Sequence, residues 1–396
     1  MRKNYKPLSV VVGVVVGILL LLVVGCRGEY EIIHSLSHET NVGEENLGQL
    51  KGFYLLNEGN MGSNKSTLDY FDFATGTYHR NIYAETNPTM VKELGDVGND
   101  IGIYGSKLYA VINVSNFIEV MDAYTAKHLG VVKIPNVRYI KFHDGKAYAS
   151  AYVAPVEFNQ NARVGMVCEI DTATLEVTRQ CNVGYQPEEL VITNGKIYVA
   201  NSGGYMFPNY DNTISVIDLE TFEVVNTIEV AINLHRLRLT PYNELICTSR
   251  GDYYYVPSRT FFVDLDTEEV TDTLDLAVTN LDISGDLAYI YSVEWSYLTN
   301  TNTITYGIFD VKTHEVVSRN FIKDGTDEDI TIPYGVKVNP VNGDIYVTDA
   351  IDYVTPGTLR CYSKFGRLKW KVDTGDIPGH FAFLYEQRKK DKTTNE

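Results

Sequence analysis

Seven short alternating segments of the chain begin with residues that could bind or transform a ligand. Carboxylates, guanidinium groups, imidazoles, amides and phenols all occur there, so these positions could supply acids, bases and hydrogen-bond partners. A mixture of this kind suits a ligand with many neutral donors and acceptors better than a single anion or cation. Aligned on the strand pattern that follows each segment, the residues are Asn99 and Asp100, Arg138 and Tyr139, Glu188 and Glu189, His235 and Arg236, Thr279 and Asn280, Tyr334, and His380.

Long aromatic loops provide a second group of candidates. Residues 201–211, NSGGYMFPNYD, separate two strand patterns that a two-residue turn could join. Comparable loops begin at Asn57, Ala151, Ser249, Val293 and Asp349. If they share one face, their rings form a binding surface; the alternative is loops that pack on one another with nothing bound. The aromatic residues are Tyr152, Phe158, Tyr205, Phe207, Tyr210, Tyr253, Tyr254, Tyr255, Trp295, Tyr297 and Tyr353.

Known catalytic signatures are missing from the sequence. It contains no HExxH, no GxSxG, no Walker loop and no sialidase-type SxDxGxTW motif. Glu188 and Glu189 could supply an acid and a base, but adjacent strand residues point to opposite faces, so we expect no shared site. Only two of the eight histidines, His235 and His380, lie at the segment starts, and no triad can be assembled. The residues therefore offer no recognised catalytic site.

The elements that must position these residues follow from an internal repeat. An apolar strand that ends in Asp and leads into a turn recurs six times, with spacings of 50, 49, 47, 46 and 46 residues. A second strand pattern, typified by GKIYV, repeats in step with it. Each GKIYV-type strand follows a short alternating strand, and each turn leads into a last strand, so each unit holds four short strands. With a weaker seventh copy, RCYSKFGRLKW, the repeat predicts an all-β, seven-bladed propeller of four-stranded antiparallel blades. The aspartates are expected to cap turns: Asp72, Asp122, Asp171, Asp218, Asp264 and Asp310.

The two ends of the repeat predict how the ring closes. The propeller domain, residues 47–385, begins at Gly52 with a second strand and ends with a first strand, GHFAFLYE. His380 to Leu384 should therefore complete the first blade and remove an open sheet edge. Because strands alternate in direction, the aromatic loops and the segment starts should surround one mouth. Residues 386–396 form a charged C-terminal tail.

Residues 1–25 are predicted to be a signal peptide. Three cations precede an apolar run from Leu8 to Gly25, and Cys26 follows directly. This pattern resembles a bacterial lipoprotein lipobox, which implies that Cys26 carries lipid and that residues 1–25 are removed. The alternative is a retained transmembrane helix.

Residues 26–46 then form the lipidated cysteine and a flexible tether, because they show little periodicity. Glu29 and Glu31 match in part the acidic pattern associated with display on the outer surface of Bacteroidetes, so we expect an outer-membrane, lipid-anchored protein that faces the exterior, with the inner leaflet as the alternative.

Composition limits the kind of partner. The chain of 396 residues is 44% apolar and 12% aromatic, as expected of a globular protein. Its formal charge of −17 becomes −20 without residues 1–25, and such a chain repels phosphate backbones, so we expect no nucleic-acid binding. The sequence has no CxxC motif, which gives little support to a zinc or redox site, although Cys168 and Cys181 could be cross-strand neighbours.

Several stretches resemble a known family. They are LLNEGNMGSNKSTLDYFD, LGDVGNDIGIYGSKLYAVIN, GYQPEELVITNGKIYVANSGGY, NYDNTISVID and EWSYLTNTNTITYGI. The chain is similar over residues 50–385 to the YncE-like seven-bladed propeller lipoproteins of Bacteroidetes, and within them to the cobalamin-binding BtuG type. The resemblance implies a non-enzymatic protein that binds cobalamin (vitamin B12) or related corrinoids and passes them to a TonB-dependent outer-membrane transporter of BtuB type.

A corrinoid suits the expected mouth because it is wide, rimmed with carboxamides and apolar across its faces, and a rigid ring of blades would lose little entropy on binding it. We expect no resident cofactor and no metal. The candidate ligand-binding residues are Asn60, Asn99, Asp100, Arg138, Tyr139, Tyr152, Glu188, Tyr205, Phe207, His235, Arg236, Arg250, Tyr254, Trp295, Tyr297, Tyr334, Tyr353 and His380.

Two other functions remain open. The same aromatic residues could bind sugars in a glycan-binding or adhesive surface protein. A propeller lactonase or lyase would instead need a metal in the central channel, and the nearest candidate ligands are Asp100, Glu189, Asn280 and His380.

Overall fold

A computed structural model describes residues 33–40, 47–90, 93–296 and 301–386. The predicted signal peptide, Cys26, Tyr297 and residues 387–396 of the C-terminal tail lie outside this part of the chain. Within the described residues, no helix has the length and apolar character needed to cross a membrane.

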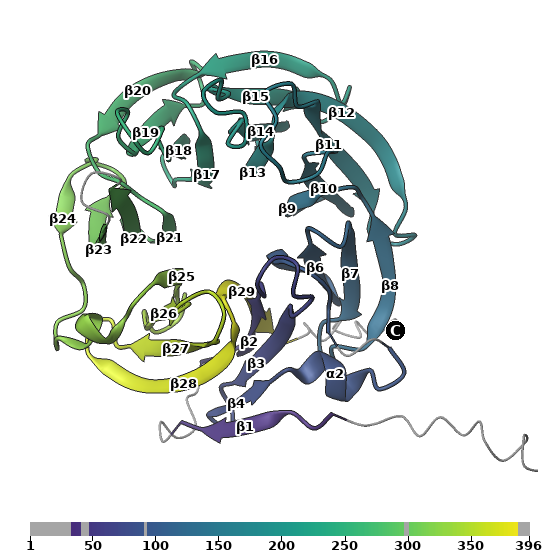
Figure 1. Ribbon diagram of the computed structural model, residues 1–396, viewed down its shortest axis with the longest axis vertical. Helices are drawn as coiled ribbons and strands as arrows, with labels where there is room; N and C mark the ends of the chain where they lie inside the picture. Colours follow the sequence, from purple (N-terminus) through teal and green to yellow (C-terminus); the bar gives the residue numbers. More distant parts are fainter. Residues whose placement is uncertain (1–32, 41–46, 91–92, 297–300, 387–396) are drawn as a thin grey trace, which may run out of the picture.

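Seven antiparallel sheets stand as blades around a common axis (Figure 1). Blades 2 to 7 each consist of four consecutive strands, with the first strand next to the axis. Blade 2 contains β5 (Gly98–Tyr104), β6 (Lys107–Ile112), β7 (Phe117–Asp122) and β8 (His128–Lys133). Blade 3 contains β9 (Val137–His143), β10 (Lys146–Ala151), β11 (Val164–Asp171) and β12 (Val177–Tyr185). Blade 4 contains β13 (Pro187–Thr193), β14 (Lys196–Asn201), β15 (Thr213–Asp218) and β16 (Val224–Glu229).

The second half of the ring repeats this order. Blade 5 contains β17 (Leu234–Leu239), β18 (Glu244–Ser249), β19 (Arg259–Asp264) and β20 (Glu269–Leu274). Blade 6 contains β21 (Asn280–Ser284), β22 (Leu287–Ser296), β23 (Thr301–Asp310) and β24 (Val316–Ser318). Blade 7 contains β25 (Pro333–Val338), β26 (Ile345–Asp349), β27 (Pro356–Tyr362) and β28 (Leu368–Asp376). Two short helices, α2 (Ile82–Thr86) and η1 (Thr326–Asp329), lie in connections between blades.

Blade 1 is closed by the two ends of the chain. β29 (Pro378–Tyr385) pairs with β2 (Leu50–Asn57), which continues outward to β3 (Thr67–Asp72) and β4 (Thr77–Arg80). The prediction of an all-β seven-bladed propeller closed by its last strand is therefore confirmed.

Blade 1 also has a fifth strand that lies inside the segment expected to be a tether. β1 (Leu36–Glu39) pairs with the outer edge of β4, with Leu36 opposite Arg80. The side chain of Glu85 in α2 accepts hydrogen bonds from the backbone N–H and the hydroxyl of Ser35. The expectation of a flexible tether is thus wrong for these residues, because the edge of β4 offers unpaired backbone groups that a short segment can bind.

The repeat produces one core between each pair of neighbouring blades. Seven clusters of buried apolar side chains occupy the seven interfaces between blades. The turns behave as predicted, because all six aspartates accept backbone N–H groups from the residues that follow them; Asp218, for example, binds the N–H groups of Glu220 and Thr221. Cys168 and Cys181 are both buried without a disulfide, and the register places Cys181 opposite Val167.

The strands that line the axis share an irregular entry. Six of the seven inner strands show a register shift near the end at which they begin. Five are entered from a residue in the left-handed region of backbone space, which is uncommon for residues other than glycine. These residues are Val97, Asn136, Gln186, Asn233 and Ile377. The entries therefore depart from simple alternation of side chains at the level of the mouth.

Candidate functional site

The propeller has two unlike faces. The loops from second to third strands and the connections between blades open on one face, which we call the mouth face, and the Asp-capped turns lie on the other, which we call the turn face. The inner strands begin at the mouth face. The candidate site residues at the strand entries therefore lie around the axis, next to the aromatic loops.

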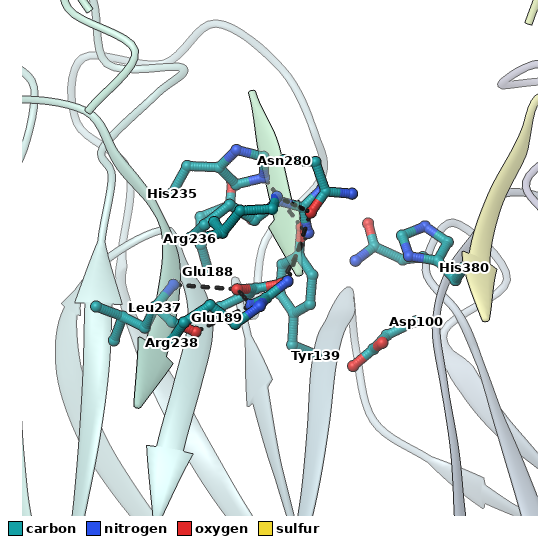
Figure 2. A network of polar contacts seen from close by, with 12 residues as sticks. Asp100, Tyr139, Glu188, Glu189, His235, Arg236, Leu237, Arg238, Asn280 and His380 are labelled. Atoms are coloured by element: carbon teal, nitrogen blue, oxygen red, sulfur yellow. Dashed lines mark hydrogen bonds and ion pairs between the residues drawn. The ribbon is translucent and has the colours of Figure 1, made fainter. Parts of the chain in front are cut away.

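The mouth face holds a buried group of charges between blades 3, 4 and 5 (Figure 2). Two carboxylates are surrounded by four guanidinium groups. We call this group the arginine cluster, and it consists of Arg138, Arg236, Arg238 and Arg250 with Glu188 and Glu189.

The carboxylate of Glu188 accepts hydrogen bonds from three side chains near the start of β13, at the mouth face. Arg138 donates from Nη2 to Oε2 at 2.9 Å, and Arg250 donates from Nη1 to Oε1 at 3.4 Å. The hydroxyl of Tyr152 donates to Oε1 at 2.6 Å. Tyr152 is buried, so it forms a wall of the site rather than its exposed rim.

Glu189 binds the neighbouring inner strand, β17. Arg236 donates from Nη1 to Oε1 at 2.8 Å, and Arg238 pairs with Oε2. The backbone N–H of Leu237 donates to the same Oε2 at 3.0 Å. The carboxylate thus ties blade 4 to blade 5 and pairs with two arginines at once.

The two adjacent glutamates do not lie on a regular stretch of strand. The register of β13 shifts between Pro187 and Leu190, and both glutamates lie within this bulge. Glu188 pairs with Arg138 of β9 and with Arg250, and Glu189 pairs with Arg236 and Arg238 of β17. Each one is engaged by two guanidinium groups.

The electrostatic environment fixes the charge states of the site. Burial opposes ionisation of Glu189, but the nearby guanidinium groups of Arg238 and Arg236 outweigh it and lower its pKa to about 2. The pKa of Glu188 is lowered for the same reason, by Arg138 and Arg250 against burial. Both carboxylates are therefore ionised at neutral pH.

His235 is held neutral beside the cluster. Burial lowers its pKa well below the usual 6.5, and the arginines around it, Arg250 first among them, lower it further. The ring nitrogen Nε2 lies 3.1 Å from the hydroxyl of Tyr139, whose oxygen also accepts a hydrogen bond from Arg236 at 3.3 Å. A hydrogen bond therefore joins the Tyr139 hydroxyl and the neutral imidazole, and the tautomer of the ring sets its direction. Burial raises the pKa of Tyr139 to about 12, so the phenol keeps its proton.

A second, smaller polar group lies across the axis, where blade 7 meets blade 1. Glu58 accepts a hydrogen bond from the hydroxyl of Tyr334 at 2.7 Å and pairs with Nε2 of His380 at 2.8 Å. The amide of Asn60 donates to the backbone oxygen of Tyr353 at 2.9 Å. The structure therefore brings four predicted site residues together here, around a glutamate that was not predicted.

The remaining polar candidates connect blades. The amide of Asn99 donates to the backbone oxygen of Arg138 at 2.6 Å, and Asp100 accepts the backbone N–H of Ile140 at 2.9 Å. The amide oxygen of Asn280 lies 3.4 Å from Nη2 of Arg238. These contacts hold the inner strands together at the level of the mouth.

The four candidate metal ligands all line a cavity of about 400 Å³ along the axis. Figure 2 shows Asp100 and His380 set apart from Glu189. Glu189 is engaged by two arginines, and over the described residues no group of three or more His, Cys, Asp or Glu side chains is arranged to hold a metal ion.

The aromatic loops of blades 3, 4 and 5 contact one another. Phe158 contacts Tyr205, and Phe207 contacts Tyr254, with ring centroids 5.9 Å apart in each pair. These contacts link the loops of blades 3, 4 and 5, in agreement with the prediction that they share a face. Tyr353 instead contacts Tyr334 of its own blade, with centroids 6.0 Å apart.

A cleft of about 450 Å³ opens between the loops of blades 5 and 6. Tyr254 from the blade 5 loop and Trp295 from β22 of blade 6 line it, and they are 55% and 41% exposed. His235 and Arg250 supply polar groups from the arginine cluster side. Its other lining residues are Tyr253, Tyr255, Val256, Pro257, Ser258, Val278, Thr279, Val293 and Glu294. We call this the aromatic cleft.

Residues 51–356 match a protein family described as a domain of unknown function, DUF5074. The chain belongs to the DUF5074 family. No curated protein matches the sequence of this DUF5074 propeller.

Solved structures resemble the DUF5074 propeller in fold. Hydrazine synthase of Kuenenia stuttgartiensis is 16% identical, with 67% of this chain and 76% of that chain covered and a TM-score of 0.54. A quinonprotein alcohol dehydrogenase-like protein of Bacteroides thetaiotaomicron is 14% identical, with coverages of 85% and 78% and a TM-score of 0.55. A functionally unknown protein of Desulfotomaculum acetoxidans is 10% identical, with coverages of 85% and 100% and a TM-score of 0.59. At these identities the likeness concerns the fold alone.

Sequence reasoning missed two side chains of the candidate site of the DUF5074 propeller. Arg238 pairs with Glu189, and its place two residues after Arg236 on one strand could have indicated a shared face. Glu58 organises the opposite side of the mouth, but no signal in the sequence distinguishes it from other loop glutamates.

Proposed function

We propose that this DUF5074 propeller is a non-enzymatic, lipid-anchored surface protein that binds cobalamin or a related corrinoid on its mouth face and passes it to a TonB-dependent transporter of BtuB type. The resemblance of its sequence to YncE-like lipoproteins of the BtuG type supports the choice of ligand. The aromatic cleft beside a polar mouth is the observation that carries the proposal.

The mouth face has the chemistry that a corrinoid requires. The apolar faces of the macrocycle can lie against exposed rings such as Phe207, Tyr254 and Trp295. Peripheral carboxamides can exchange hydrogen bonds with exposed polar groups at the rim. A cleft of about 450 Å³ receives part of such a ligand, and the remainder lies over the mouth.

The rigidity of the frame favours binding. Glu189 and Asp100 each accept a backbone N–H from the next blade, so the strand entries are fixed before any ligand arrives. A preformed site loses less conformational entropy on binding than a mobile one.

Titration with cyanocobalamin, set against a panel of glycans, tests this function. The wild type should bind cyanocobalamin, and Trp295→Ala should weaken the affinity by about 10- to 30-fold, as expected for removal of an aromatic anchor. Phe365→Ala is the matched control, because Phe365 is 71% exposed and lies in the turn between β27 and β28 on the turn face. Wild-type protein that binds a glycan and no cyanocobalamin would replace this proposal with the adhesive alternative.

The anchor and the transfer step are tested in cells. Cys26→Ala should abolish incorporation of labelled palmitate and lower uptake of labelled cyanocobalamin to the level of cells without the propeller. Normal labelling or normal uptake in the variant would contradict the proposed anchoring. The control is Cys181→Ala, which removes a thiol buried within blade 3.

A further inference from the structure

We propose that the aromatic cleft is a subsite for a planar heterocyclic ring that carries a phosphate group, with the ring between Tyr254 and Trp295 and the phosphate at Arg250. In a complete corrinoid this is the nucleotide, whose flat base is joined to the macrocycle through a phosphodiester. The inference rests on the proposed function for the identity of the ligand, while its chemistry is that of a nucleotide in general.

Positive charge is concentrated at this side of the mouth. The arginine cluster has four guanidinium groups and two carboxylates, although the whole chain carries a formal charge of −17. The cluster therefore has two more guanidinium groups than its own carboxylates can neutralise. An arriving anion would balance part of this excess in a partly buried setting, where charge pairs are stronger than in water.

Arg250 is the member of the cluster that faces the cleft. Its side chain is 32% exposed, and within the described part of the chain it makes one hydrogen bond, at 3.4 Å to Glu188. A guanidinium group has five N–H donors in a planar fork that matches a phosphate. Arg250 therefore keeps donors available for a ligand.

The cluster has other unused donor capacity. Nε of Arg138 is buried and has no hydrogen-bond partner among the described residues. Glu188 is held by Arg138 and Tyr152 as well as by Arg250. Arg250 can therefore turn toward a phosphate without leaving the carboxylate unpaired.

The charges that the two blades contribute to the cleft set the direction of the ligand. Arg250 lies on the blade 5 side, together with Tyr254, while Glu294 lies beside Trp295 on blade 6. The carboxylate of Glu294 repels an anion on its own side. A ring with a phosphate should therefore enter with the phosphate toward blade 5 and the ring faces toward the two aromatic side chains.

The test uses isothermal titration at low salt with two corrinoids, cyanocobalamin and dicyanocobinamide, which has the same macrocycle and lacks the nucleotide. Adenosine monophosphate and adenosine serve as a second pair of probes. The proteins are the wild type, Arg250→Gln, and Arg259→Gln as a matched control. Arg259 has the same charge and pairs with the exposed Asp275 outside the cleft lining.

Wild-type protein should bind cyanocobalamin about 10- to 100-fold more tightly than dicyanocobinamide, as expected for a charge-assisted phosphate contact. Arg250→Gln should weaken only cyanocobalamin and remove most of this ratio, and Arg259→Gln should leave it unchanged. Circular dichroism and thermal unfolding should show that all three proteins are folded, because Arg250 contributes one long contact to the cluster.

The possible results test the nucleotide subsite and the proposed corrinoid-binding function separately. Equal affinity for both corrinoids, or equal weakening of both by Arg250→Gln, would overturn the subsite and leave corrinoid binding intact. If neither corrinoid binds, the proposed function fails. The subsite would still be supported if the wild type bound adenosine monophosphate more tightly than adenosine and Arg250→Gln removed the difference. Without such a difference, the subsite would be overturned as well.

Discussion

The mouth face and the turn face are built from the same repeated blade, yet they are held together differently. On the turn face each aspartate binds N–H groups two or three residues away, so every turn is closed locally. On the mouth face Glu188 and Glu189 bind side chains about 50 residues away on neighbouring blades. The difference shows that the repeat fixes one face by local contacts, and that the other face depends on contacts between blades.

This difference has an energetic consequence. A buried carboxylate and a buried guanidinium group both lose hydration, and the loss is offset only while the pair is intact. An exposed turn carboxylate remains hydrated whether or not its hydrogen bonds form. The mouth face is therefore the more sensitive to loss of a single charge.

The largest effect is expected from Glu189→Gln. The Glu189 side chain is 4% exposed, and the substitution leaves Arg236 and Arg238 without their paired carboxylate. We expect the free energy of unfolding to fall by about 3–5 kcal/mol. Chemical denaturation of the purified propeller, followed by tryptophan fluorescence and by circular dichroism, measures it.

The matched change on the turn face is Asp264→Asn, which removes the charge from a carboxylate that binds Thr267 in an exposed turn. Its effect should be clearly smaller than that of Glu189→Gln. Equal losses in the two variants would mean that the two faces do not differ in the way proposed.

The features that the sequence alone predicts are those with a local cause. The six turn aspartates recur at nearly constant spacing because each turn needs a side-chain acceptor at the same place. Closure through His380 to Leu384 could also be predicted, because a first strand at one end of the chain matched a missing first strand at the other.

The features that the sequence alone does not predict depend on contacts between distant segments. Glu188 and Glu189 lie in the bulge at Pro187–Leu190, and their pairing with arginines of blades 3 and 5 depends on contacts between blades. β1 forms only because the outer edge of β4 is open to it. The candidate residues at the strand entries were aligned correctly, but their separation into an arginine-rich side and a Glu58 side requires the geometry of the ring.

The buried imidazole at the mouth gives a smaller effect, which depends on pH. Because burial and the arginines around it lower the pKa of His235 well below 6.5, the folded protein binds its proton less readily than the unfolded chain does. His235 therefore contributes full stability above about pH 6.5, and this contribution falls as the pH drops below the unfolded pKa. Between pH 7.5 and pH 5.5 the loss should reach about 1.4 kcal/mol.

His235→Gln should remove this dependence, since the amide can either donate or accept the hydrogen bond with Tyr139 but takes up no proton in this range. Denaturation midpoints at the two pH values, compared between wild type and variant, measure the difference. His143→Gln is the control, because His143 lies outside the arginine cluster and its side chain is 48% exposed. If wild type and His235→Gln lose the same stability over this range, His235 is not held neutral by the cluster, and the mouth face is less electropositive than its four arginines imply.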